Sequence, residues 1–277
     1  MITIEELRFE IRTNPVFRVF AYPWGARKRK RDLEKYYLSG ENLKLLDYKN
    51  IHQGKRCFIV GNGPSINQND LDLIKDEISF GVNSIYKMFD KTFWRPTYYV
   101  SSDSDVVAKK INEIQEIECD TKFIDMRFLD YKDLLGKCVF ICSDPKFIIN
   151  IYNTKAQVQE DLTQYFGQGE TVTFTVMQLA FWMGFTYIYL IGQDFNMPFY
   201  KDKYGIPHST EAKETHFKNG DIFRRTYLYR DSNLYAYQQA RKYCEENGII
   251  IKNATRGGKL EVFERTTLEE ILSEGTK

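Results

Sequence analysis

Short, continuous runs of apolar residues alternate along this chain with segments in which apolar residues have helical spacing. The runs have the length of strands and no polar face, which is typical of strands buried on both faces of a parallel sheet. The predicted strands cover residues 56–60, 78–83, 97–101, 122–125, 138–142, 187–191 and 249–251. The predicted helices cover residues 70–77, 106–117, 171–183 and 234–247. This alternation predicts a Rossmann-like α/β fold, a mostly parallel sheet with helices on both faces.

Local signals indicate where some of these helices begin and end. Gly184 and Gly248 follow the last apolar residues of two predicted helices, where a C-terminal glycine is common. Thr267 and Glu270 have the spacing of a capping box, which predicts a further short helix.

The first 54 residues follow a different pattern and predict a helical, basic N-terminal extension before an α/β domain over 55–277. Residues 4–11 have the spacing of a short amphipathic helix. Residues 17–24 are rich in aromatic and apolar side chains, and five consecutive cations follow at 27–31. Residues 17–31 could contact an anionic membrane surface, where each cation contributes about 1 kcal/mol. The cations could equally form the solvated face of a helix, and both interpretations stay open.

A polar and aromatic segment over 193–231 interrupts the alternation, and its length predicts a lid-like loop over the ligand cleft. It contains His208 and His216, two of the three histidines. A loop histidine titrates near neutral pH and is a natural general base. His52 precedes the first predicted strand, and we expect no catalytic role for it.

Composition narrows the class of protein further. The formal net charge of +1 gives no support to a nucleic-acid partner, and 43% hydrophobic residues exclude wholesale disorder. No apolar run has the length of a membrane span, and the first residues lack the apolar core of a secretory signal. The five cysteines are odd in number and mostly lie in apolar runs, so we expect reduced thiols and a cytoplasmic protein.

Small and polar residues follow several predicted strands, at 61–65, 83–84, 101–105 and 192–194. Ligands of open α/β sheets bind at the carboxyl ends of the strands. The nucleotide-binding candidates at these ends are Gly61, Asn62, Gly63, Pro64, Ser65, Asn83, Ser102, Asp103 and Gly192. Glycines let a backbone approach phosphate, and the two asparagines could bond a base or a ribose.

Asp103 and Asp105 form a DxD pattern at one of these strand ends. Two carboxylates at this spacing could hold a divalent ion against a diphosphate. Alternatively, Asp103 caps the following helix and Asp105 favours its dipole, and both interpretations stay open. The chain has no nucleophile elbow, no Walker lysine and no GxGxxG pattern, which argues against hydrolase, P-loop and dehydrogenase functions.

Residues 58–65 with 81–83 resemble the nucleotide-binding start of bacterial lipooligosaccharide sialyltransferases, and residues 171–195 continue the resemblance. The same segments, with His216-Phe217 and residues 253–263, resemble still more closely a bacterial family of flagellin glycosylation factors and 6-hydroxymethylpterin pyrophosphokinase-like proteins. Together they cover about residues 55 to 270.

The resemblance implies a sialyltransferase-like nucleotide-binding fold and a glycosyltransferase of bacterial surface-glycan biosynthesis. The donor would be a nucleotide-activated sugar, a CMP-sugar, and the acceptor a glycan or a lipid-linked molecule. Transfer would need no metal or other cofactor, and the protein would work in the cytoplasm, in one interpretation at the inner face of the membrane. The alternatives are an ATP-dependent pyrophosphokinase for a small acceptor such as a pterin, which would use Mg²⁺, and a non-catalytic nucleotide-binding protein.

The resemblance also implies roles for individual residues. It makes His216 the general base, with Asp194 as a second catalytic candidate, although spacing leaves His208 open as the base. Residues 169–173 match the donor-contacting turn, and the candidates there are Gly169, Thr171 and Thr173. This chain has Gly-Glu-Thr where the sialyltransferases have Thr-Ser-Gly, which affects the choice of donor sugar.

Overall fold

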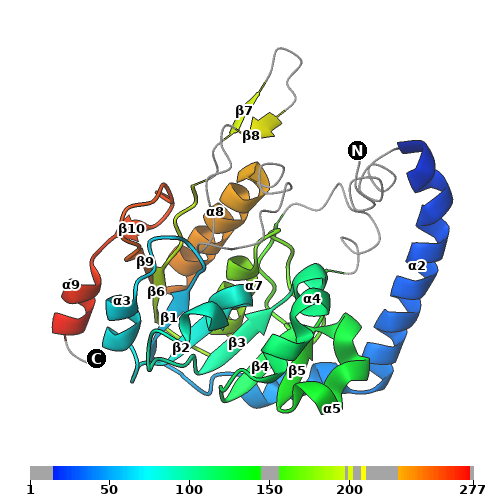
Figure 1. Cartoon of the computed structure of the whole chain (residues 1–277), viewed down its shortest axis with the longest axis horizontal. Helices are drawn as coiled ribbons and strands as arrows, with labels where there is room; N and C mark the ends of the chain where they lie inside the picture. The colour runs from blue at the N-terminus through cyan, green and yellow to red at the C-terminus, as the bar shows by residue number, and fades with distance from the viewer. Residues whose placement is uncertain (1–14, 145–155, 197–198, 202–206, 210–229, 275–277) are drawn as a thin grey trace.

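An eight-stranded parallel sheet forms the centre of the protein (Figure 1). The structure is a computed structural model that describes residues 15–144, 156–196, 199–201, 207–209 and 230–274. The strand order is β10-β9-β6-β1-β2-β3-β4-β5, and all neighbours pair in parallel. The strands are β1 (Arg56–Val60), β2 (Ser79–Val82), β3 (Tyr98–Ser101), β4 (Thr121–Asp125), β5 (Cys138–Ile141), β6 (Tyr187–Ile191), β9 (Ile250–Asn253) and β10 (Glu264–Arg265). The predicted α/β Rossmann-like fold is confirmed.

Helices cover both faces of this sheet. The first face carries α3 (Gln68–Leu73), α4 (Ser104–Gln115), α5 (Lys132–Leu135) and α9 (Leu268–Ser273). The second face carries α7 (Val172–Trp182) and α8 (Arg230–Asn247). Short 3-10 helices complete the connections, namely η1 (Glu41–Tyr48), η2 (Asn83–Met88) and η3 (Met126–Tyr131).

The surroundings of β1 explain why its sequence is apolar without interruption. Successive side chains of a strand point to opposite faces. Cys57 and Ile59 therefore pack in the core under α7, whereas Phe58 and Val60 pack in the core under α3 and α4. Each of these four residues is fully buried. A strand covered by helices on both sides leaves no position for a polar side chain.

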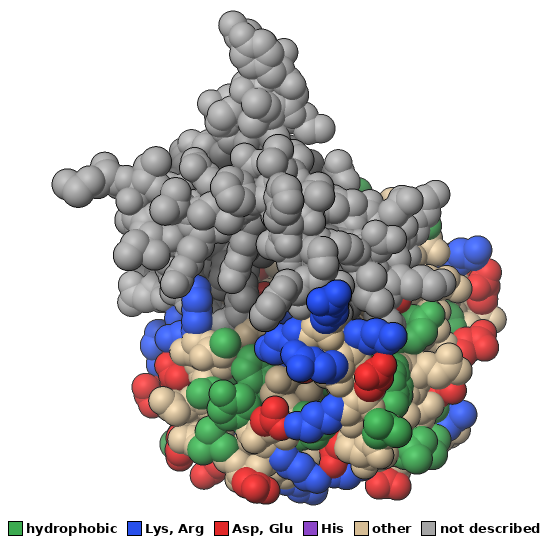
Figure 2. Space-filling model, turned by 90° about the vertical axis from the view of Figure 1, so that its right-hand side faces the viewer, with side chains coloured by type: hydrophobic (Ala, Val, Ile, Leu, Met, Phe, Trp, Pro, Cys, Tyr) green, Lys and Arg blue, Asp and Glu red, His purple; other side chains and the backbone are tan. Residues whose placement is uncertain are grey.

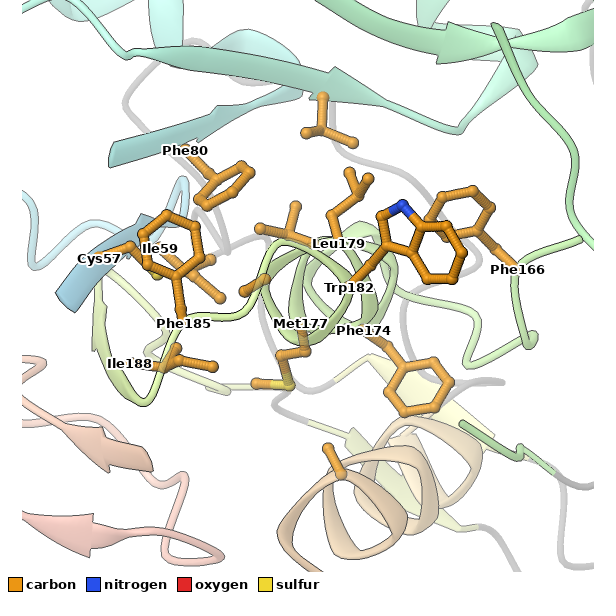
Figure 3. Packing of buried hydrophobic residues seen from close by; sticks show 14 of the residues in the cluster. Cys57, Ile59, Phe80, Phe166, Phe174, Met177, Leu179, Trp182, Phe185 and Ile188 are labelled. Carbon is orange, nitrogen blue, oxygen red and sulfur yellow. The ribbon is translucent and has the colours of Figure 1, made fainter. Parts of the chain in front are cut away.

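Helix α7 is apolar on nearly all sides because it lies between the sheet and α8. Figure 3 shows Leu179 and Trp182 of this helix among core residues that include Phe80 of β2 and Phe166. The indole nitrogen of Trp182 donates to the carbonyl of Leu45 at 2.7 Å. Gly184 follows the helix with a φ of 84°, as the C-terminal glycine signal predicts.

The N-terminal region joins the sheet at its β5 edge. It contains α2 (Pro15–Leu38) and η1, and the hydroxyl of Tyr36 donates to the carbonyl of Phe140 on β5 at 2.9 Å. Leu45 of η1 is fully buried in the main core. The predicted domain boundary at residue 54 stays a prediction, and the amphipathic helix predicted at 4–11 lies outside the described residues.

The basic run 27–31 lies on α2, with most of its side chains exposed. Lys30 forms an i,i+4 ion pair with Glu34 at 3.9 Å. Figure 2 views the side of the molecule on which α2 lies, and Lys and Arg side chains gather there. The exposure of these side chains agrees with both interpretations, so the solvated face and membrane contact stay predictions.

Some predicted elements differ in extent from the structure. The helix predicted over 70–77 is α3, which ends at Leu73 because Ile74 leaves the helical region at φ −103° and ψ 14°. Inside the predicted lid over 193–231, β7 (Phe199–Lys201) and β8 (Pro207–Ser209) pair antiparallel, and 230–231 already belong to α8. Strand β10 was not predicted because two residues carry no periodicity.

Two further expectations concern thiols and membranes. All five cysteines are free, and four of them are buried. Burial raises the pKa of Cys142 to about 12 and that of Cys138 to about 11. Among the helices of the described residues, none combines the length and hydropathy that a membrane crossing requires.

Candidate functional site

The sheet changes its direction of growth between β1 and β6. The chain builds β2, β3, β4 and β5 on one side of β1 and then returns to place β6 on the other side. Ligands of open α/β sheets bind outside the carboxyl ends of the strands at such a switch point. The loops that leave β1 and β6 here are residues 61–65 and 192–194. The topology therefore brings the glycine-rich candidates and Asp194 to one edge.

Backbone hydrogen bonds hold these two loops against each other. The amide of Gly61 donates to the carbonyl of Ile191, and the amide of Gly63 donates to that of Gly192, both at 2.9 Å. A Cβ atom at Gly61 would lie 2.4 Å from the carbonyl oxygen of Gly192, and one at Gly63 would lie 1.7 Å from Oδ2 of Asp194. Both positions thus require glycine because the loops are in direct contact.

Asp194 is a buried residue at the end of β6 to which two other loops attach. Its Oδ2 accepts hydrogen bonds from the Ser65 hydroxyl at 2.7 Å and from the Ser65 amide at 3.4 Å. Its carbonyl accepts from the amide of Lys259, beyond β9, at 2.7 Å. The side chain is nearly enclosed. Asp194 therefore organises the edge of the sheet, and its catalytic role stays a prediction.

The two candidate asparagines lie at the ends of β1 and β2. Asn62 Nδ2 donates to the carbonyl of Val82 at 3.0 Å, which fixes the orientation of the amide. Its Oδ1 is buried and has no hydrogen-bond partner in the described part of the chain. Asn83 has a φ of 45°, and its Oδ1 accepts from the hydroxyl of Ser101 at 3.0 Å. Asn62 thus keeps a fixed acceptor at this edge.

The DxD segment follows β3. Asp103 is exposed, and its Oδ1 accepts from the amide of Val106 at 3.4 Å, while its carbonyl accepts from the amide of Val107. These contacts are those of a residue that caps α4, as one interpretation expects. Ser102 Oγ lies 3.5 Å from Oγ1 of Thr175 on α7. Among the described residues, no group of three or more His, Cys, Asp or Glu side chains could hold a metal ion.

The start of α7 attaches to the end of β6. Thr171 is the N-cap and accepts from the amide of Thr173 at 3.3 Å. The hydroxyl of Thr173 donates to Oε1 of Gln193 at 3.0 Å. Gly169 lies against Phe174 of the same helix. Of the candidates in the donor-contacting turn, Thr173 therefore lies next to the switch point.

The three histidines lie in different parts of the chain. His216 lies outside the described residues, and the backbone of His208 lies in β8. His52 stacks on Phe185 at 4.8 Å between ring centroids, and its Nε2 lies 2.7 Å from the hydroxyl of Tyr98. Burial, together with the nearby Lys55, lowers the pKa of His52. These packed surroundings suit a structural histidine.

The comparison with protein families gives one match. A family model described as "MptE-like: 6-hydroxymethylpterin diphosphokinase MptE-like" matches residues 34–198. The chain belongs to the MptE-like family. The match includes the loops after β1 and β6, with Asn62 and Asp194, and ends before His208 and His216. No curated protein and no solved structure matches the chain.

Membership of the MptE-like family places the chain in a family with an enzyme-related description. This supports the pyrophosphokinase-like part of the expected resemblance. The relationship to sialyltransferases stays a prediction.

Sequence reasoning did not choose Gln193 and Glu170 as site residues. Gln193 lies between the candidates Gly192 and Asp194, so the rule of polar strand ends was a sufficient signal for it. Glu170 lies between Gly169 and Thr171 and has a φ of 54°, an uncommon value for a residue with a side chain. Burial raises the pKa of Glu170 to about 7. Nothing in the sequence marks that conformation or that burial.

An open groove lies beside this edge, between α8 and the segment after β9. Its volume is about 560 Å³, and its lining includes Phe195, Leu234, Arg241, Lys259 and Glu261. Phe195 directly follows Asp194. The groove therefore adjoins the switch point and offers charged groups of both signs.

Proposed function

We propose that this protein is a glycosyltransferase that binds a nucleotide-activated sugar, a CMP-sugar, at the switch point between β1 and β6. A hydroxyl of a surface-glycan or lipid-linked acceptor bonds to the anomeric carbon of the sugar as the bond to the phosphate breaks and CMP leaves. His216 takes the proton of that hydroxyl as the general base, and Asp194 lies beside the donor. The observation that carries this proposal is the buried Oδ1 of Asn62, which has no partner in the described chain. A buried acceptor of this kind needs a hydrogen-bond donor from outside the described chain, and a ligand or an ordered water can supply it.

The other parts of the proposal follow from the surroundings of Asn62. Gly61 and Gly63 let the loop that carries Asn62 pack directly against the end of β6. The groove beside Phe195 offers room for an acceptor. The mixed charges of Arg241, Lys259 and Glu261 suit a hydroxyl-rich or acidic acceptor. Transient contact of residues 17–31 with an anionic membrane would bring the enzyme to lipid-linked acceptors.

A second candidate function comes from the description of the MptE-like family. In this function a hydroxyl of a small acceptor, such as a pterin, attacks the β-phosphorus of ATP and takes the β,γ-diphosphate, and AMP leaves. Mg²⁺ would neutralise charge on the phosphates. The candidate carboxylates are Asp103, Asp105 and Asp194, and the side chain of Asp105 lies outside the described residues. Asp103 caps α4, and Asp194 binds Ser65. These engagements favour the first function.

Thermal unfolding with CMP, CDP, UDP and ATP, each added alone, tests the two functions. A ligand at a hundred times its Kd adds about 2.7 kcal/mol to the free energy of unfolding. The glycosyltransferase proposal expects the largest shift with CMP and turnover that EDTA spares. A shift with ATP alone, and turnover lost in EDTA and restored by Mg²⁺, would instead support the second function. No shift with any nucleotide would overturn both.

A further inference from the structure

Two buried amides at the switch point each keep one polar atom without a partner in the described chain. The atoms are Oδ1 of Asn62, an acceptor, and Nε2 of Gln193, a donor. Each of the two residues is only 8% exposed. An unsatisfied buried polar group costs about 1–3 kcal/mol, so two of them at one edge need a physical reason.

The surroundings of Gln193 direct its free donor to the loop after β1. Its Oε1 accepts from the hydroxyl of Thr173, and its backbone amide donates to Oγ1 of Thr255, both at 3.0 Å. Helix α7 and the loop after β9 therefore hold the residue from two sides. Nε2 occupies the space beside Gly61, where a Cβ atom would lie 2.5 Å from it. The donor is thus next to the residue that precedes Asn62.

Gln178 shows that a buried glutamine in this protein can satisfy both ends of its amide. It is 1% exposed. Its Nε2 donates to the carbonyls of Gly167 and Phe174 at 3.0 and 3.2 Å, and its Oε1 accepts from the amide of Gly167 at 2.9 Å. Gln193 differs from Gln178 in that its donor Nε2, next to Gly61 at the switch point, has no partner in the described chain.

The chemistry of the pair selects the part of a nucleotide that fits it. A phosphate offers acceptors, so it could serve Gln193 Nε2 but would leave Asn62 Oδ1 unsatisfied. A nucleoside offers a donor beside an acceptor, on the edge of the base or on the ribose hydroxyls. We propose that Gln193 and Asn62 bind the nucleoside part of the donor, and that Gln193 determines specificity for it. This inference rests on the proposed binding of a nucleotide at this edge.

Calorimetric titration with CMP and with cytidine, which lacks the phosphate, tests the pair. Gln193→Met removes the donor at similar volume, and Gln193→Glu keeps the acceptor for Thr173 while it replaces the donor. We expect either variant to lose about tenfold or more in affinity, by the same factor for CMP and for cytidine. In the control Gln178→Met, we expect a lower melting temperature with an unchanged Kd. Melting curves identify the folded variants, and Gln193→Glu is the one to titrate if Gln193→Met does not fold.

Titrations with uridine and 2′-deoxycytidine then distinguish whether the pair binds the base or the ribose. Loss of the preference for cytidine over uridine in the variants assigns the pair to the base, and loss of the preference for cytidine over 2′-deoxycytidine assigns it to the ribose. Folded Gln193 variants with wild-type Kd values would overturn the inference, as would a loss of affinity for CMP but not for cytidine. In both cases wild-type CMP binding leaves the proposed function standing, whereas a wild-type protein that binds no nucleotide refutes both.

Discussion

The hydroxyl of Ser65 donates a 2.7 Å hydrogen bond to Oδ2 of Asp194, and so joins the loop after β1 to the end of β6. The same Oδ2 occupies the space that a Cβ atom at Gly63 would need. Asp194 can therefore reach Ser65 only because residue 63 has no side chain. The loop that presents Asn62 takes its shape from this contact.

We expect Gly63→Ala to destabilise the protein and to weaken nucleotide binding. A Cβ atom 1.7 Å from a carboxylate oxygen forces the loop or Asp194 to move, and overpacking of this kind costs about 1–3 kcal/mol. Urea unfolding and CMP titration measure the two effects. Ser65→Ala is the matched control. It removes the hydrogen bond to the carboxylate, at a cost of about 1.5–3 kcal/mol, but introduces no steric clash. Equal stability of Gly63→Ala and wild type would contradict the close contact.

We expect Asn62→Ala to weaken nucleotide binding while the protein stays folded. The substitution removes the buried acceptor Oδ1 and one hydrogen bond to Val82. Titration with CMP measures the affinity, and melting curves verify the fold. Asn247→Ala is the control, because Asn247 is exposed at the end of α8, just before β9 begins. Unchanged affinity in a folded Asn62→Ala protein would count against this site.

The layers of this fold can be predicted because a strand that is buried on both faces has apolar residues at consecutive positions. Cys57, Phe58, Ile59 and Val60 are apolar at consecutive positions, and the structure buries them in alternation on two faces. No local pattern in the sequence indicates the order of the strands in the sheet. That β6 pairs with β1 depends on contacts such as Val60 beside Ile191, between segments far apart in the chain. The sequence therefore predicts that strand ends form the site, but not which of these ends lie next to each other.

Gln193 illustrates the same limit within the site. Its polar character is visible in the sequence, but its partners Thr173 and Thr255 lie 20 and 62 residues away. Whether a buried amide is satisfied depends on such distant partners. The local capping box of Thr267 and Glu270, in contrast, was predicted from spacing alone and is confirmed.

We expect Glu170→Gln to change how stability depends on pH. Burial raises the pKa of Glu170 from its ordinary 4.5 to about 7 in the folded protein. Between these values the folded state holds a proton that the unfolded state releases, so wild-type stability falls as pH rises through this window. A neutral glutamine does not titrate, so this loss of stability is absent from the variant. The free energy of unfolding of the variant therefore rises relative to that of the wild type from pH 5 to pH 8. Urea unfolding across this range measures the difference.

Glu246→Gln is the control for this comparison because Glu246 is an exposed carboxylate on α8. We expect its curve of unfolding free energy against pH to run parallel to that of the wild type. A parallel curve for Glu170→Gln as well would show that the Glu170 carboxyl titrates alike in the folded and unfolded states.

We expect His216→Ala to lose catalytic rate while it keeps its affinity for the donor. The acceptor hydroxyl has a pKa far above neutral, so its proton must leave as the bond to the anomeric carbon forms. Removal of a positioned base costs about 10²–10⁴-fold in rate. His208→Ala is the matched control, since it removes a second histidine of the same segment, and we expect a much smaller loss. Steady-state kinetics with the donor that stabilises the wild type measures kcat and KM for both variants. A near-wild-type His216→Ala enzyme would refute the assignment, and an inactive His208→Ala enzyme would move the base to β8.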